Sequence, residues 1–333
     1  MPALGKATIG DLDSLLKSKM PALGIDLGGT KILAAPVVEG HVIGEPLKEA
    51  TPNGPDKILE KLAAIIARFQ TDYVLAGVGI ATAGIVDPDT GEIVGSTGNL
   101  PGWTGTKLKQ VLESKTMLPV HVENDANAAA YGEARVRNLK DKECVVLLTL
   151  GTGLGGGILI KGQLYRGAHF SAGECGHIRI SLGNQRLCTC GLFDCWEAFV
   201  AGRGIVATAK EFAQDKTEAQ SSLVAMAKTD RLTPEIVVEQ STKGDILAQK
   251  VMRVWHEHLC AGMTSLVHVL DPDCFILSGG LSKCVDVGLI TELLSDRTLS
   301  HPGNKVEVFI SELGYQAGMI GAAHIVLDKV AAI

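Results

Sequence analysis

The sequence has few aromatic residues, no long apolar run and no excess of positive charge, and each absence excludes a class of protein. No apolar stretch approaches the roughly 18 residues that a membrane-spanning helix needs. The first 20 residues carry five charged side chains and no hydrophobic signal core, which favours the cytoplasm. With 37 acidic against 31 basic residues, the formal charge of −6 offers no general attraction for nucleic acid or anionic lipid. We therefore expect neither nucleic acid nor membrane as a partner.

The length and the glycine content indicate an enzyme-sized architecture. A chain of 333 residues exceeds one ordinary core, so two domains with a cleft between them are expected. Aromatic residues make up only 4%, and the core must therefore be mainly aliphatic. The 39 glycines against 12 prolines predict many tight backbone approaches.

Apolar strands alternate with amphipathic helices, a pattern typical of an α/β fold. Strands are expected at 22–25, 32–38, 73–81, 118–123, 144–150, 158–160, 178–181, 274–277 and 306–310. Helices are expected from Pro55, near Trp196 and from Tyr315, and over 106–115, 126–138 and 245–270. Two glycine turns, in Asp26–Lys31 and Gly151–Gly157, link consecutive strands, and this self-similarity predicts two related lobes. Residues 1–21 form a short polar lead-in, with one or two helical turns, and have no assigned function.

Three glycine-rich segments are candidate phosphate-binding loops, because backbone N–H groups there can approach phosphate oxygens without an intervening Cβ. They comprise Gly28, Gly29, Thr30 and Lys31; Gly151, Thr152 and Gly153; and Gly279 and Gly280. Asp26 precedes the first loop, where its carboxylate would hold magnesium or its waters together with the Thr30 hydroxyl. Taken alone, the first and third segments are equally explained by an ordinary hairpin and a plain turn.

The second loop also matches the dinucleotide-binding pattern G-x-G-x-x-G at Gly151, Gly153 and Gly156, with Glu174 about 20 residues later. That pattern must open a helix, whereas the residues from Gly157 predict a strand, a turn and another strand. No lysine followed by Ser or Thr completes a Walker motif either. A hairpin loop suited to phosphate remains.

A cysteine cluster predicts a structural zinc site. Cys188, Cys190 and Cys195 lie within eight residues, and adjacent C-x-C thiols make a strained mutual disulfide. His177 completes a closed Cys3His set, with Cys175 as an alternative fourth ligand. Such a zinc ion leaves no position for water, so its expected work is to fix the loop that carries Glu174 and Glu197, whose carboxylates can accept hydrogen bonds from sugar hydroxyls.

These motifs together resemble the ROK family of sugar kinases and repressors, in order from Ala22 to the closing helix. The matching motifs are Asp26-x-Gly-Gly-Thr-Lys31, Glu123-Asn-Asp125, the Gly151–Gly157 loop, Glu174-x-Gly-His177 and the cysteine stretch that ends at Glu197. One departure is Asp194, where the family usually has Gly directly before the last Cys. The resemblance implies a two-lobed actin-like ATPase (ribonuclease H-like) fold. The small lobe would comprise 22–136 and 314–333, so that the C-terminal helix packs back on it, and the large lobe 137–313.

The resemblance also assigns roles to single residues. Asp125 matches the general base of the family, although an Asp before Ala126 is also explained as a helix N-cap. The sugar-contacting positions are matched by Asn99, Asn124, Asp125, Glu174, His177 and Glu197. The structural zinc ligands are matched by His177, Cys188, Cys190 and Cys195. Trp103, near Asn99, is explained by packing alone.

The implied function is transfer of the γ-phosphoryl group of ATP, with magnesium, to the 6-hydroxyl of a hexose, with glucose first. N-acetylmannosamine or N-acetylglucosamine is the alternative substrate, because the same polar set can bind either kind of sugar. A sugar-responsive repressor needs an N-terminal helix-turn-helix domain, and only 21 residues precede the first strand. A chaperone or filament ATPase would leave the cysteine cluster and the paired glutamates unexplained. By analogy with its relatives the protein is expected to form a homodimer, and polyphosphate stays open as a donor.

Overall fold

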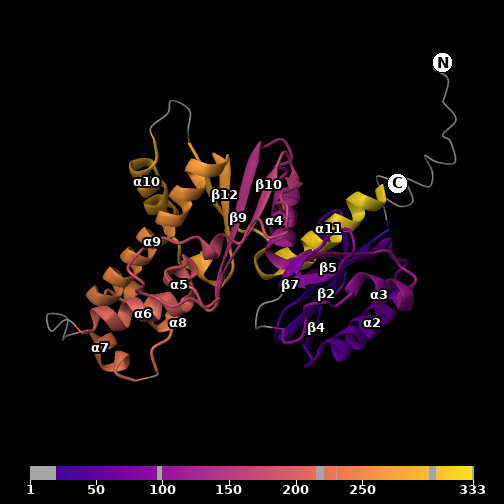
Figure 1. Ribbon diagram of the computed structural model, residues 1–333, viewed down its shortest axis with the longest axis horizontal. Helices are drawn as coiled ribbons and strands as arrows, with labels where there is room; N and C mark the ends of the chain where they lie inside the picture. Colours follow the sequence, from indigo (N-terminus) through magenta and orange to yellow (C-terminus); the bar gives the residue numbers. More distant parts are fainter. Residues whose placement is uncertain (1–19, 96–99, 215–220, 230, 300–304, 332–333) are drawn as a thin grey trace, which may run out of the picture. The chain divides into compact units, whose positions relative to one another are not determined.

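The computed structural model describes residues 20–95, 100–214, 221–229, 231–299 and 305–331 (Figure 1). The helical turns predicted before residue 20 and the candidate residue Asn99 lie outside the described residues. The described chain forms two compact units. Unit 1 holds the residues before Asp141, the segment Gly167–Ser171 and the residues from Gln316, and unit 2 holds Asp141–Arg166 and Ala172–Tyr315.

Unit 1 is built on a six-stranded sheet. The sheet has the order β3-β2-β1-β5-β8, and β4 also pairs with β2. Its strands are β1 (Ala22–Leu27), β2 (Lys31–Val38), β3 (His41–Val42), β4 (Leu47–Ala50), β5 (Gly77–Thr82) and β8 (Val120–Asn124). Strands β1 and β2 are antiparallel, whereas β1, β5 and β8 run parallel. A separate hairpin pairs β6 (Ile85–Val86) with β7 (Ile93–Gly95).

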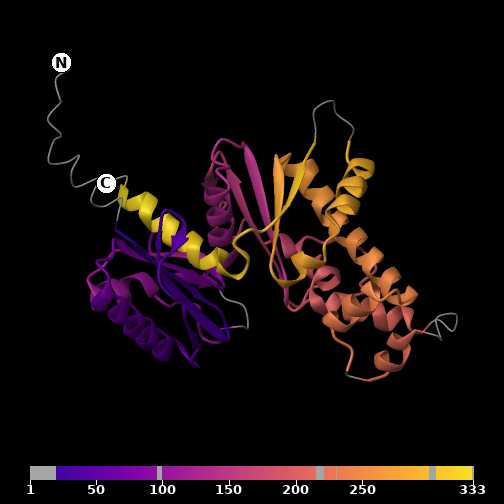
Figure 2. The same ribbon diagram turned by 180° about the vertical axis from the view of Figure 1, so that it is seen from behind.

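The two faces of this sheet carry different side chains because strand residues alternate between faces. On one face, large aliphatic residues such as Ile25 and Ile80 form a core with α2 (Pro55–Asp72) and α3 (Leu108–Thr116). On the other face, Gly24 and Gly79 lie against the backbone of α11 (Ala317–Ala331). Helix α11 crosses this face and packs along α4 (Asp125–Val136), as both views show (Figures 1 and 2).

Unit 2 contains a five-stranded sheet of order β11-β10-β9-β12-β13 and a mainly helical region. The strands are β9 (Cys144–Leu150), β10 (Leu154–Ile160), β11 (Gln163–Leu164), β12 (Cys274–Ser278) and β13 (Glu307–Ile310). The helices are α5 (Glu197–Val200), α6 (Gly202–Phe212), α7 (Ser222–Ala227), α8 (Pro234–Thr242), α9 (Ile246–Leu270) and α10 (Val287–Arg297). Short 3-10 turns lie at Cys175–His177, Gly280–Cys284 and Gly314–Gln316.

The two sheets repeat one pairing scheme. In each, the two antiparallel strands joined by a glycine turn, β1–β2 and β9–β10, are followed by two further strands parallel to the first. The predicted self-similarity of the two glycine turns is therefore present in the sheet topology. None of the described helices has the length and apolar character needed to cross a membrane.

Three predicted elements differ from the structure. The strand expected at 73–81 begins only at Gly77, because α2 runs to Asp72 and Tyr73 caps it by donating its N–H to Phe69 O. No strand forms at 178–181, where a single bridge joins Arg179 to Cys195. The second glycine loop is shorter than Gly151–Gly157, because β10 already begins at Leu154.

Candidate functional site

The first glycine turn joins β1 and β2 in unit 1. Gly28 N–H donates to Lys31 O over 3.0 Å. Thr51 anchors both sides of the turn, since its hydroxyl donates to Gly28 O at 2.6 Å and its N–H donates to Thr30 O at 3.1 Å. Gly29, Thr30 and Lys31 are exposed. The turn is thus fixed at its base and open at its tip, as a loop that receives a ligand should be.

Asp26 is the last polar side chain of β1 and points to the face covered by α11. An added Cβ on Gly318 of that helix would lie 3.4 Å from Asp26 Cγ. Burial and the nearby charge of Asp125 raise the pKa of Asp26 to about 7, against the opposing effect of Lys31. A carboxylate whose ionisation is disfavoured by burial and by a neighbouring carboxylate is chemically suited to bind a cation.

Asp125 opens helix α4, directly after β8. The N-cap is Asn124, whose Oδ1 accepts from the backbone N–H groups of Ala126 and Asn127, at 2.9 and 3.1 Å. Asn124 also donates through Nδ2 to Gly84 O at 3.0 Å. Capping is therefore the role of Asn124, and the simple N-cap explanation does not account for Asp125.

The Asp125 carboxylate combines accessibility with an unfavourable setting for its charge. The side chain reaches solvent, and Oδ1 accepts from Ala126 N at 2.9 Å. Desolvation by the surrounding protein raises the pKa of the carboxyl above its usual range, although backbone N–H groups of Asp125 and Ala126 act in the opposite direction. A higher pKa makes this carboxylate a better proton acceptor.

A second acidic residue, Glu123, supports this corner and was not predicted to have a role. It is 3% exposed, and its Oε1 accepts from Asn124 N at 3.1 Å and Asn127 Nδ2 at 3.0 Å. Glu123 therefore fixes the strand-to-helix junction that carries Asp125. The only signal in the sequence is its place within the matched Glu-Asn-Asp motif.

The second glycine loop, Gly151–Gly153, follows β9 in unit 2. It is closed by a bond from Gly151 N to Gly153 O at 3.0 Å, and Gly202 N donates to Gly151 O at 3.0 Å. The third segment follows β12, the parallel neighbour of β9. Gly279 has φ +85°, and a Cβ there would lie 2.3 Å from Leu150 O. The structure therefore brings both glycine segments to the carboxyl edge of one sheet, where α/β folds bind ligands.

The predicted metal ligands lie together. His177, Cys188, Cys190 and Cys195 place their ligand atoms within 4.8 Å of one another. The Sγ atoms of Cys190 and Cys195 are 3.7 Å apart, and Cys188 Sγ lies 3.8 Å from His177 Nδ1. Tetrahedral zinc with Zn–S bonds of about 2.3 Å separates its sulfur ligands by about 3.8 Å. Cys175, the alternative ligand, is not in the cluster; its Sγ packs against Gly156, where an added Cβ would lie 2.7 Å from it.

Asp194, the departure from the family pattern, adopts a backbone conformation that favours glycine, with φ +61°. Asp tolerates this region better than most residues do. Its carboxylate accepts from the N–H groups of Gln185 and Arg186, at 2.8 and 2.9 Å. Asp194 thus preserves the turn before Cys195, and its side chain also holds the segment that contains Gln185 and Arg186.

The two predicted sugar-contacting glutamates have different surroundings. Glu174 is exposed, and its Oε2 lies 3.8 Å from His177 Nε2, so it orients the ring whose Nδ1 faces the cysteines. Glu197 is 9% exposed and accepts from Leu154 N, Thr189 Oγ1 and Arg203 Nη2. Thr189 and Arg203 had no predicted role, because neither residue occupies a defining position of a motif that the sequence analysis identified.

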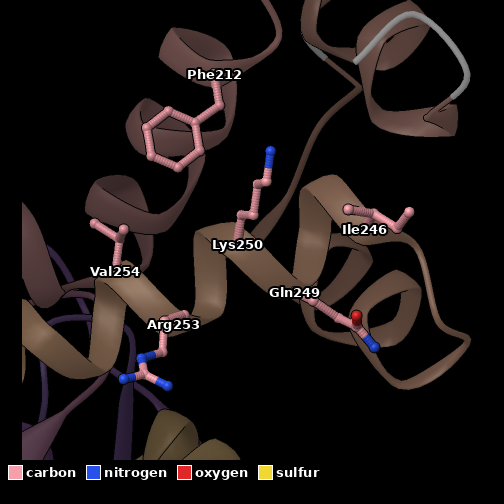
Figure 3. Close-up of a pocket in the computed structure, with 6 residues that line it drawn as sticks. All are labelled: Phe212, Ile246, Gln249, Lys250, Arg253 and Val254. Atoms are coloured by element: carbon pink, nitrogen blue, oxygen red, sulfur yellow. The ribbon is translucent and has the colours of Figure 1, made fainter. Parts of the chain in front are cut away.

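Trp103 packs, as expected. It is fully buried in unit 1 and donates from Nε1 to Thr82 Oγ1 at 3.2 Å. Separately, a hollow of about 540 Å³ lies between α6 and α9 in unit 2, with Phe212 from α6 and the remaining labelled side chains from α9 (Figure 3). The hollow is lined by Phe212, Ile246, Gln249, Lys250, Arg253 and Val254. None of these is a predicted site residue.

Two related α/β units with glycine loops at the carboxyl edges of their sheets define the class of fold. Comparison with solved structures confirms the predicted actin-like ATPase fold. The ROK family glucokinase from Streptomyces griseus, solved in complex with glucose and AMPPNP, is 34% identical, with a TM-score of 0.74 over 92% of this chain and 98% of its own. The ROK hexokinase from Thermus thermophilus is 28% identical, with a TM-score of 0.77 over 94% and 100%.

Sequence comparison places the protein within this class. Residues 22–329 match the ROK family, and the chain therefore belongs to it. A glucokinase from Streptomyces coelicolor is 35% identical over 306 residues, which cover 90% of this chain and 96% of the relative. The predicted family is confirmed.

Proposed function

We propose that the protein transfers the γ-phosphoryl group of ATP to the 6-hydroxyl of a hexose, with glucose as its substrate. The observation that carries this proposal is the setting of Asp125, an accessible carboxylate of raised pKa fixed at the start of α4 by its Asn124 cap. The similarity to a glucokinase in complex with glucose and AMPPNP supports the choice of sugar and of donor.

Asp125 acts as the general base in this proposal. Its Oδ1 accepts from Ala126 N, which leaves Oδ2 to receive the proton of the sugar hydroxyl as the new O–P bond forms. A base of this kind typically contributes about 10²- to 10⁴-fold to the rate. Phosphoryl transfer otherwise depends on positioning and on stabilising charge, so the remaining residues mainly hold the two substrates.

The glycine segments hold the nucleotide. In unit 1, Gly28 closes the turn through its bond to Lys31 O, the exposed Gly29 presents its backbone N–H at the tip, and the exposed Lys31 adds a positive charge for phosphate. In unit 2, the Gly151–Gly153 loop and the Gly279–Gly280 segment do the same. Asp26 and Thr30 would hold magnesium or its waters, and the raised pKa of Asp26 fits a carboxylate that exchanges a proton for a cation. Magnesium, when bound, supplies positive charge against the phosphate oxygens.

The sugar contacts proposed from the family motifs are Asn99, Asn124, Asp125, Glu174, His177 and Glu197. Asn99 lies outside the described residues. Zinc at His177, Cys188, Cys190 and Cys195 would cross-link the loop that carries Glu174, His177 and Glu197, and the 3.7 Å separation of two of its sulfur atoms fits that ion. With four protein ligands the metal takes no part in the chemistry.

An ADP-release assay over a small sugar panel tests this function. The panel contains glucose, N-acetylmannosamine and N-acetylglucosamine, with ATP or polyphosphate as donor. We expect turnover with glucose and ATP, and a product phosphorylated at the 6-position by ³¹P–¹H NMR. Turnover with an N-acetylated sugar but not with glucose would assign the protein to the alternative substrate class. No turnover with any sugar would contradict the kinase function.

Two further expectations concern the assembly and the location of the protein. The homodimer and the cytoplasmic location remain predictions, and the choice between ATP and polyphosphate as donor is decided by the assay above.

A further inference from the structure

The carboxylate of Glu197 joins three separate segments of unit 2. Oε2 accepts from Leu154 N at 3.1 Å. Oε1 accepts from Thr189 Oγ1 at 2.9 Å and from Arg203 Nη2 at 2.8 Å, and Cys188 Sγ lies 3.6 Å from it. Because Glu197 is only 9% exposed, these bonds are shielded from water. The residue begins α5, and the helix fixes the position of its backbone. Several hydrogen bonds that converge on one buried carboxylate fix its position.

The first segment is the second glycine loop. Leu154 directly follows Gly151–Gly153, and a Cβ on Gly153 would lie 2.7 Å from Glu197 Oε2. The other end of the loop is held where Gly202 N donates to Gly151 O at 3.0 Å. Both ends of the loop therefore rest on the α5–α6 segment, and Glu197 provides the side-chain contact.

The second segment is the loop of metal ligands. Thr189 stands between Cys188 and Cys190, and Cys195 lies two residues before Glu197. The Thr189 hydroxyl therefore connects the middle of the metal loop to the carboxylate that holds the glycine loop. Two hydrogen bonds to one carboxylate therefore join the metal loop to the glycine loop.

We propose that Glu197 is a positioning residue through which the metal loop sets the conformation of the second glycine loop and so the affinity for nucleotide. This inference rests on the proposed function, in which that loop binds the phosphates of ATP. A glycine loop left free would lose much conformational entropy on binding, and a loop held in its binding conformation avoids that loss. The metal site thus acts on the donor substrate as well as on the sugar.

The test leaves Glu197 itself unchanged, since it also has a proposed sugar contact. Thr189→Val removes the hydroxyl and keeps the shape, all metal ligands and the Leu154 bond. Thr189→Ser restores the hydroxyl and serves as the rescue. Arg203→Met removes a second donor from the same oxygen. Thr242→Val, at an exposed hydroxyl bonded within its own helix to Glu239 O, is the matched control.

Isothermal titration with magnesium-AMPPNP and, separately, with glucose measures both affinities, and metal analysis gives the zinc content. We expect Thr189→Val and Arg203→Met to weaken AMPPNP binding about three- to tenfold, with glucose affinity and zinc content within twofold of the wild type. Thr189→Ser and Thr242→Val should bind AMPPNP as the wild type does.

Two results would overturn this inference and leave the proposed function intact. In the first, Thr189→Val binds AMPPNP as the wild type does. In the second, its glucose affinity or zinc content falls as much as its AMPPNP affinity does. A wild-type protein that binds no AMPPNP would instead contradict the proposed function, and the inference with it.

Discussion

The two units share one sheet topology but hold their glycine turns by different means. In unit 1 the turn at Gly28–Lys31 is fixed by Thr51, and the sheet beneath it packs directly on the backbone of α11. In unit 2 the turn at Gly151–Gly153 is held by a buried carboxylate that is also bonded to the metal loop. Repeated topology therefore does not imply repeated stabilisation: in unit 1 the sheet beneath the turn is closely packed on a helix, whereas in unit 2 a polar network holds the second phosphate loop.

The largest effect should follow from disturbing the close packing of unit 1. A Cβ on Gly79 would lie 1.9 Å from Ala322 O, a backbone atom that cannot move alone. We expect Gly79→Ala to lower the free energy of unfolding by about 3 kcal/mol or more, measured by urea denaturation. Gly280→Ala is the control, because its Cβ would meet nothing within 4 Å. Equal stabilities for the two variants would refute close packing as the support of unit 1.

Removing a metal ligand should affect unit 2 in a different way. Cys190 is the exposed member of the cluster, so Cys190→Ser adds no cavity. We expect the purified variant to retain less than about half an equivalent of zinc, and its AMPPNP affinity to fall with the metal. Cys284→Ser, outside the cluster, should keep both. A full equivalent of zinc in Cys190→Ser would show that this cysteine is not a ligand.

A smaller effect is expected from the carboxylate beside the first glycine turn. Because the pKa of Asp26 is raised to about 7, the folded protein binds this proton more tightly than the unfolded chain does. The free energy of unfolding contributed by this group therefore falls as pH rises from about 4 to about 7. We expect the Tm of Asp26→Asn minus the Tm of the wild type to be about 2 °C or more higher at pH 8 than at pH 5. Both proteins are measured without magnesium or nucleotide.

The control for this pH dependence is Asp72→Asn, which changes an exposed carboxylate at the end of α2. Its Tm difference from the wild type should not follow the same course. If Asp26→Asn differs from the wild type by the same amount at both pH values, the proton held at Asp26 plays no part in stability.

Local pattern was sufficient to predict most elements of the fold. The apolar run Cys144–Leu150 forms β9 with the predicted bounds, and the amphipathic run from Asp245 forms α9, capped by Asp245 at Ala248 N. The strand expected at 178–181 failed because the chain there follows the metal loop instead of pairing in a sheet. Periodicity reports burial of alternate residues, and it cannot distinguish a strand from an extended segment held by ligands.

The candidate site was predicted residue by residue, but not its internal connections. Spacing grouped the three cysteines with either His177 or Cys175 as the fourth ligand, because metal ligands often follow a short-range pattern, and the structure groups them with His177. Nothing in the sequence connects Glu197 with Leu154, 43 residues away, or separates the cap Asn124 from the neighbouring Asp125. Such contacts depend on how the folded segments pack together, and they become visible only in the three-dimensional structure.

The most direct test of the account compares turnover with binding in Asp125→Asn. Steady-state kcat is measured with glucose and ATP, and the affinities for glucose and magnesium-AMPPNP are measured by titration. The account predicts that kcat falls by about 10²-fold or more while both affinities stay within about threefold of the wild type. Turnover within tenfold of the wild type, with the affinities preserved, would contradict the assignment of Asp125 as the base.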